Sequence, residues 1–176
     1  LAPSGSTNLT ADIGISGALR WRTPLGDVRV DREGAQLLLE AIPELEVDDA
    51  SHRDEHSLEV QLPFLQLLSK ESRMIPITIG LEDFSAYQSF GRDLASAVSR
   101  LPAPVVVIAS SVMTHYEPDD VTKEKDQKAI EAILGLDADE LFRRVKRYGI
   151  SMCGFAPVCA MMTYGRERGA LRGELV

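Results

Sequence analysis

Apolar positions recur along the chain with two different spacings, and together they predict an α/β architecture. Apolar residues at successive or alternate positions predict strands at 13–15, 28–30, 74–79 and 105–109. Apolar residues three or four positions apart predict helices within 31–42, 83–101, 119–134, 137–147 and 157–169. Strands that alternate with helices are typical of a three-layer sandwich, with a central, mixed and mostly parallel sheet flanked by helices.

The segment 105–109 is apolar at every position, which predicts a strand buried on both faces of the sheet. A small, polar segment follows it, from Ser110 to Tyr116, and includes His115. Ligands of open α/β sheets bind at the carboxyl ends of strands. We therefore expect chemistry at this loop.

The segment 52–66 is the second candidate, because titratable residues there precede an apolar helical pattern. His52 and His56 lie four positions apart, so on a helix they would share a face and could both bind a metal ion. The apolar residues that predict the helix and its anchorage in the core are Leu58, Leu62, Leu65 and Leu68. The alternative is that His56 or Asp54 caps the helix and that His52 lies in solvent.

Cys153 precedes a helix that Pro157 begins, so the positive end of the helix dipole would favour its thiolate. Cys159 falls inside that helix and is expected to pack in the core. Two cysteines do not make a disulfide framework, and they fit a cytoplasmic protein.

Length and charge exclude some classes of protein. The 176 residues suffice for one domain, and we find no linker that would divide 1–176. The net charge of −8, without a basic cluster, argues against nucleic acid and against an anionic membrane as partners. No apolar run approaches the roughly 18 residues that a membrane-spanning helix needs. The oligomeric state stays open.

The titratable candidates are Glu55, His56, His115 and Cys153, which lie at three junctions between loops and elements. Two histidines and a thiolate suit copper, zinc or ferrous iron. A histidine could instead activate Cys153 as a nucleophile. Each residue also has a structural explanation: His115 could bond a strand end, Cys153 could be an inert apolar residue, and Glu55 could be a solvated cap.

Four ordered segments closely resemble the Memo family, also called the AmmeMemoRadiSam system protein B group, over residues 1 to about 170. They are T-P-L-G at 23–26 with Val30 and Asp31, E-H-S-L-E-V-Q-L-P-F at 55–64, I-A-S-S-V-M-T-H-Y at 108–116, and S-M-C-G at 151–154. The resemblance implies a fold like that of class III extradiol ring-cleaving dioxygenases. It also implies a metal-binding, redox-linked protein of undefined substrate, with copper or iron as the metal and zinc as a surrogate.

The resemblance assigns roles to residues of this chain. Cys153 matches the family's metal-binding cysteine, and His115 matches the histidine of its S-S-D-x-x-H motif, so both are candidate metal ligands. His56 matches the histidine of E-H-S and, with Glu55 and His115, is a candidate catalytic residue. These assignments predict that His56, His115 and Cys153 meet in one pocket at the carboxyl end of 105–109.

Two positions depart from the family's pattern. Val112 stands where the family has an aspartate, and Gly5 stands where its G-P-[SN]-H motif has a metal-binding histidine. A further metal histidine belongs to an earlier P-H-A-G-Y segment that is not among these residues. The expectation is that an N-terminal segment is lacking from this chain; the alternative is a metal-deficient member of the family.

Three functions follow from these observations. The first is a metal-dependent, dioxygenase-like oxidoreductase. The second is a catalytically inactive module that binds a small molecule or a peptide in the same pocket, which Val112 favours. The third is a hydrolase or transferase with Cys153 as its nucleophile.

Overall fold

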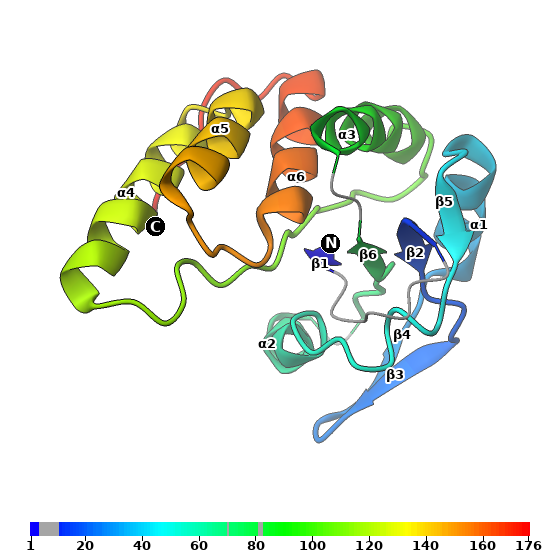
Figure 1. The fold of residues 1–176 in the computed structure, drawn as a ribbon. Coiled ribbons are helices and arrows are strands. Elements are labelled where there is room, and N and C mark those ends of the chain that lie inside the picture. Colours follow the sequence, from blue (N-terminus) through cyan, green and yellow to red (C-terminus); the bar gives the residue numbers. More distant parts are fainter. Residues whose placement is uncertain (4–10, 70, 81–82) are drawn as a thin grey trace.

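A computed structural model describes residues 1–3, 11–69, 71–80 and 83–176, and it shows a mixed four-stranded sheet at the centre of the molecule (Figure 1). In spatial order the strands are β1 (Ala2–Pro3), β6 (Ile77–Ile79), β2 (Ile13–Ile15) and β5 (Leu45–Val47). The two outer pairs are parallel, and β2 runs antiparallel to β6. The predicted mixed, mostly parallel sheet is confirmed.

Helices cover both faces of this sheet, which confirms the three-layer arrangement. They are α1 (Arg32–Ala41), α2 (Leu62–Leu68), α3 (Phe84–Val98), α4 (Asp119–Leu134), α5 (Ala138–Tyr148) and α6 (Phe155–Glu167), with a short 3₁₀ turn η1 (Glu59–Gln61) before α2. In Figure 1, α3 and α6 lie on one side of the sheet and α2 lies on the other. No helix among the described residues has the length and apolar character needed to cross a membrane.

The core forms where α3 and α6 pack together over the sheet. Tyr87 and Phe90 of α3 and Cys159 and Met162 of α6 are fully buried. The two helices approach closely at Gly91, where an added Cβ would lie 2.6 Å from the carbonyl oxygen of Ala160. The apolar stripe predicted for 83–101 is thus the face that forms the core.

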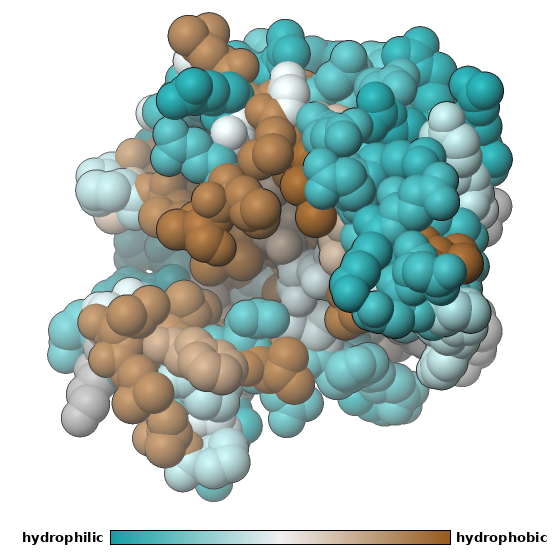
Figure 2. All heavy atoms as spheres, turned by 90° about the vertical axis from the view of Figure 1, so that its left-hand side faces the viewer, coloured by the Kyte–Doolittle hydropathy of each residue, from teal (hydrophilic) through white to brown (hydrophobic). Residues whose placement is uncertain are grey.

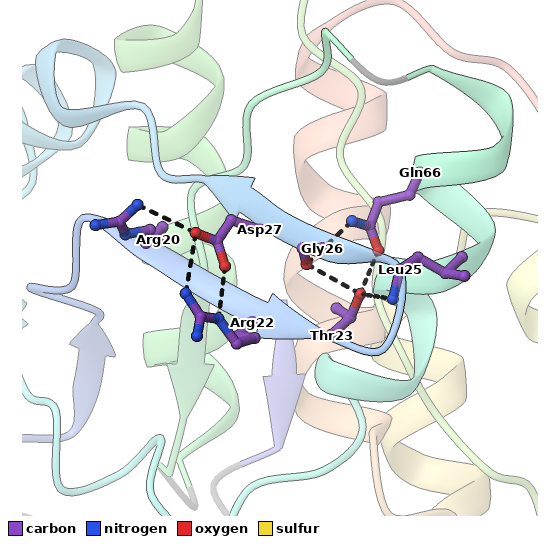
Figure 3. A network of polar contacts seen from close by, with 7 residues as sticks. All are labelled: Arg20, Arg22, Thr23, Leu25, Gly26, Asp27 and Gln66. Carbon is purple, nitrogen blue, oxygen red and sulfur yellow. Dashed lines mark hydrogen bonds and ion pairs between the residues drawn. The ribbon is translucent and has the colours of Figure 1, made fainter.

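A two-stranded hairpin, β3 (Arg20–Thr23) and β4 (Gly26–Arg29), projects beside the sheet. The apolar pattern does not predict β3, because its mostly polar side chains give no apolar alternation. Asp27 instead holds the hairpin by ion pairs with Arg20 at 3.1 Å and Arg22 at 2.9 Å (Figure 3).

The hairpin is joined to α2 by a small hydrogen-bond network (Figure 3). The Thr23 hydroxyl donates to Gln66 Oε1 at 2.6 Å and accepts from the backbone N–H of Leu25 at 3.1 Å. The amide nitrogen of Gln66 donates to the carbonyl oxygen of Gly26 at 3.3 Å. One side chain of α2 therefore fixes both the turn and the position of the hairpin.

The segment 105–109 forms no strand, contrary to the prediction. Val106 is 83% exposed and Ile108 is 44% exposed, so the segment is not buried on both faces. Its one backbone partner among the described residues is Leu1, which donates to Ile108 O at 2.6 Å and accepts from Ser110 N at 2.9 Å. Val107 and Ala109 are partly buried and pack against the core, so only one face of the segment is covered.

Two helices begin beside a proline. α2 begins at Leu62 with Pro63 in its first turn. Only Leu62 of this helix is buried, so its far end is not core, contrary to the prediction. α4 begins at Asp119 after Pro118, so neither Asp119 nor Asp120 is its cap.

Aspartate side chains cap the starts of α1 and α5. Asp31 accepts from the N–H of Gly34 at the start of α1, and Asp137 accepts from the N–H of Glu140 at the start of α5.

Candidate functional site

Ser110 joins the segment that contains Glu55 and His56 to the residues that follow 105–109. Its hydroxyl donates to the carbonyl oxygen of Ser57 at 3.0 Å and accepts from Gln61 Nε2 at 3.4 Å. Neither Ser110 nor Gln61 is recognisable as a site residue from the sequence by itself. Only the motifs around these two residues point to them, because polar side chains that bond across loops leave no periodic pattern in the sequence.

The residues after Ser110 run beside the segment that leads into α6. The N–H of Cys153 donates to Val112 O at 3.3 Å, and the N–H of Val112 donates to Cys153 Sγ at 3.3 Å. The N–H of His115 donates to Ser151 Oγ at 2.7 Å, and that hydroxyl donates back to His115 O at 3.2 Å. Cys153 and His115 therefore belong to two facing segments, although they lie far apart in sequence.

Gly154 allows these segments to approach each other. Its N–H donates to Ser111 Oγ at 3.0 Å, and an added Cβ would lie 2.6 Å from Ser111 Cβ. α6 begins at the next residue, Phe155, so Cys153 precedes a helix N-terminus as predicted. The expectation that the dipole favours a Cys153 thiolate stays a prediction.

The imidazole of His115 has an unused nitrogen. Its Nδ1 atom is buried and has no hydrogen-bond partner among the described residues. The backbone of His115, rather than its ring, makes the bonds that hold this loop. A buried nitrogen without a partner is costly, and it can bind a metal ion, a water molecule or a substrate.

Glu55 is buried, so the alternative that it is a cap exposed to solvent is wrong. Its carboxylate accepts hydrogen bonds from the backbone and hydroxyl of Ser57, and from the N–H of Leu58 at 3.1 Å. It thus caps the turn before η1 from inside the protein. His56, next to it, is exposed.

His52 and His56 do not share a helix face, because residues 52–58 precede the helix. The ring of His52 contacts Trp21 edge-on at 5.6 Å and is half-buried, so the solvated alternative is also wrong.

The pKa of His52 is lowered, chiefly because burial removes its cation from water. The Gly14 backbone and the charges of Glu55, Asp49 and Asp48 oppose this shift.

The loop that carries these residues is anchored to the sheet. The hydroxyls of Ser51 and Thr78, both buried, lie 2.7 Å apart, and the carboxylate of Asp48 accepts from the N–H groups of Ala50 and Ser51. This network positions the start of the loop against β2 and β6.

The two cysteines differ in their surroundings. Cys159 is fully buried, as expected, and burial, with a smaller effect of the Asp139 charge, raises the pKa of its thiol to about 12. Cys153 is exposed.

The predicted convergence of His56, His115 and Cys153 in one pocket stays a prediction. The described residues contain no group of three or more His, Cys, Asp or Glu side chains that could hold a metal ion. Ser4 and Gly5, where the family has its G-P-[SN]-H motif, lie outside the described residues.

Two hollows lie elsewhere on the described part of the chain. One is a polar cleft between α4 and α5. The other, of about 350 Å³, lies between the hairpin and α2 and has mostly apolar walls.

The whole chain, residues 1–176, matches the family model described as "Memo-like protein". It is 43% identical over 157 residues to a MEMO1 family protein of Methanosarcina barkeri, covering 89% of this chain and 58% of that protein. It is 41% identical over 157 residues to one of Methanopyrus kandleri (89% and 56%) and 37% identical over 166 residues to one of Pyrobaculum aerophilum (94% and 59%). The chain thus spans less than three fifths of these relatives.

Proposed function

The chain belongs to the Memo family, and from that premise we propose that it binds a copper or iron ion through Cys153 and His115 and serves a redox-linked reaction. The observation that carries the proposal is the pairing of 111–115 with 151–154, which brings the thiol and the imidazole onto facing segments. The two free thiols, one exposed at Cys153 and one buried at Cys159, and the acidic charge are consistent with a cytoplasmic protein that does not bind nucleic acid.

The two donors are chemically suited to such an ion. Thiolate and imidazole are soft and borderline ligands, which favour copper, iron and zinc over magnesium or calcium. Nδ1 of His115 has no partner among the residues described here, so binding a metal ion would cost no existing hydrogen bond. Two donors from the chain leave further positions of the ion for substrate, for water or for residues of the longer family polypeptide.

The remaining candidates would act around the ion. When bound, the metal would supply the electron transfer. His56 is exposed, and its side chain makes no hydrogen bond to the residues that the structure describes, so we assign it proton transfer with a substrate. The carboxylate of Glu55 is occupied by Ser57 and Leu58, and it would therefore hold the segment of His56 in place.

A second candidate function is a module that binds a small molecule or a peptide without catalysis. Val112 favours it, because its exposed apolar side chain stands where the family has a carboxylate. A hydrolase or transferase with Cys153 as nucleophile is the weakest candidate, since the bonds that the described residues make to Cys153 Sγ come from the Val112 backbone and not from a histidine.

Elemental analysis of protein purified without oxygen tests the first proposal. We expect near-stoichiometric copper or iron in the unaltered protein, and about tenfold less in Cys153→Ala and in His115→Gln. Loss of a metal ligand, or of a residue that orients one, typically lowers metal affinity by that much or more. Cys159→Ala is the matched control, because it removes the buried thiol and leaves the facing segments intact.

Equal metal content in Cys153→Ala and in the control would overturn the metal assignment. If no protein in the series holds metal, binding of small molecules or peptides becomes the function to test.

A further inference from the structure

The two segments that carry Cys153 and His115 run antiparallel, and one of them has an extra residue in the pairing. Cys153 and Val112 face each other, because the N–H of each donates to an atom of the other at 3.3 Å. Ser151, two positions before Cys153, bonds His115, which lies three positions after Val112. Residues 113–114 therefore stand opposite a single residue. That count defines a β-bulge, a feature that redirects side chains and is frequent beside functional sites.

A side chain takes the place of the backbone where the pairing resumes after the extra residue. In a regular antiparallel pair, two facing residues exchange bonds between their own N–H and C=O groups. At Ser151 the hydroxyl does both, because a hydroxyl can donate and accept. It accepts from the N–H of His115 at 2.7 Å and donates to the carbonyl oxygen of His115 at 3.2 Å. Removing this hydroxyl would therefore leave both backbone groups of His115 without their partner.

The chain is also bent on both sides of this histidine. Before it, the N–H of Thr114 leaves the pairing and donates to Asp126 Oδ1 of α4 at 2.9 Å. After it, Tyr116 has a φ of 57°, a left-handed conformation that residues other than glycine rarely adopt. Glu117 is then held by an ion pair with Lys125 at 2.6 Å. These contacts fix the flanks of the loop, but none of them bonds the histidine itself.

Packing of apolar side chains holds this loop only in part. Met113 contacts the core, whereas Val112 is 60% exposed and Tyr116 is fully exposed. Figure 2 shows apolar side chains in two open areas, with a hollow between them, on the side of the molecule towards which 110–118 runs in Figure 1. Beyond Met113, hydrogen bonds rather than burial therefore fix the path of the loop.

We propose that Ser151 is a positioning residue whose hydroxyl sets the register of His115 against Cys153 and, through it, the geometry of the proposed metal site. Among the residues that the structure describes, Ser151 alone bonds the backbone of His115. The buried Nδ1 atom of the imidazole has no partner there, so the ring takes its place from the backbone. The role at the metal rests on the proposed function, whereas the register does not.

Hydrogen exchange of the metal-free chain tests the register. Ser151→Ala removes the acceptor of the His115 N–H, so we expect that amide to exchange about tenfold faster or more. Ser151→Thr keeps a hydroxyl and should exchange as the unaltered chain does. Thr122→Val is the matched control, because the Thr122 hydroxyl bonds the carbonyl oxygen of Glu117 in the same loop at 3.3 Å. It should leave exchange of the His115 amide unchanged.

Cobalt(II) serves as the probe metal for the site, because its visible absorption depends on the identity and geometry of its ligands. We expect Ser151→Ala to bind cobalt(II) about tenfold more weakly, the usual loss when a residue that orients a ligand is removed. The spectrum of the bound ion should change as well. Ser151→Thr should restore both, and Thr122→Val should alter neither. A loss of stability alone would leave the spectrum of the remaining complex as it was, and circular dichroism would establish that the variants are folded.

Four results would count against the proposal. Equal exchange of the His115 amide in Ser151→Ala and Thr122→Val would overturn the register. Equal cobalt(II) affinity and spectra in those two variants would overturn the positioning role. Failure of Ser151→Thr to restore exchange and binding would show that the hydroxyl is not the cause. An unaltered chain that takes up no cobalt(II) would overturn the proposed function and the role at the metal, while the exchange comparison would still decide the register.

Discussion

Gly154 is the residue on which the approach of the two candidate segments depends. A methyl group at this position would lie 2.6 Å from Ser111 Cβ, closer than side-chain atoms normally come. We expect Gly154→Ala to lower the free energy of unfolding by about 1–3 kcal/mol, the usual cost of overpacking. It should also move Cys153 away from Val112. Chemical denaturation measures the first effect.

Gly165→Ala is the matched control for Gly154→Ala. Gly165 lies near the end of α6, the helix that Gly154 precedes, and its added Cβ would meet Ala170 at an ordinary 3.7 Å. Replacing a helical glycine by alanine removes backbone freedom from the unfolded chain, so this variant should be neutral or more stable. Equal destabilisation of the two variants would mean that close approach is not the reason for glycine at 154.

Val112 offers a test of the metal proposal in which metal affinity should rise rather than fall. Its backbone bonds Cys153 while its side chain is exposed. A carboxylate there can bind the ion or orient a ligand, so Val112→Asp should raise metal affinity about tenfold or more. Competition with a coloured chelator measures the affinity. The exposed Val106→Asp is the control, and equal affinity of both variants would place position 112 outside the reach of the ion.

The lowered pKa of His52 predicts that the free energy of unfolding depends on pH. Burial lowers its pKa in the folded protein below the value of an ordinary histidine, near 6.5. The unfolded chain then binds more protons between the two pKa values, so the free energy of unfolding falls as pH drops below about 6.5. His52→Gln should remove this part of the dependence.

Urea denaturation from pH 7.5 to 5 would measure the effect of His52. His56→Gln, the same substitution at an exposed histidine, serves as the control. An identical pH slope for His52→Gln and the unaltered protein would contradict the prediction.

At the scale of elements, the hairpin and α2 should behave as one unit. Thr23 and Gln66 share a hydrogen bond of 2.6 Å, and each also bonds the turn. Thr23→Val should cost about 1 kcal/mol of unfolding free energy, a typical value for a hydrogen bond. A double-mutant cycle with Gln66→Ala should show positive coupling, whereas additive effects would mean that the two elements dock independently.

Helices could be predicted from the sequence more closely than strands. Asp31 and Asp137 carry the signal of their caps in the residue type itself, and both caps are present. β3 consists of polar residues and depends on ion pairs from Asp27, a cross-strand partner that no local pattern reveals. The segment 105–109 has an unmistakable strand pattern, but a strand also requires a neighbour, which sequence spacing cannot supply.

At the scale of the whole molecule, the candidate site is an arrangement of three distant segments. Motifs identified Glu55, His115 and Cys153 individually. The bonds that join their segments come from Ser57, Ser110, Ser111 and Ser151, whose short polar side chains resemble those of any loop. The order of motifs could therefore predict the family and the layered sheet, but not which loops touch.

The two cysteines differ in exposure, so a spectroscopic probe can be attached selectively to one of them. The Cys159 thiol is fully buried with a pKa of about 12, whereas Cys153 is exposed. A thiol-directed spin label or fluorophore should attach at a single, known position without any cysteine having to be removed. That label would sit beside Val112, so events in the loop of His115 could be followed in real time.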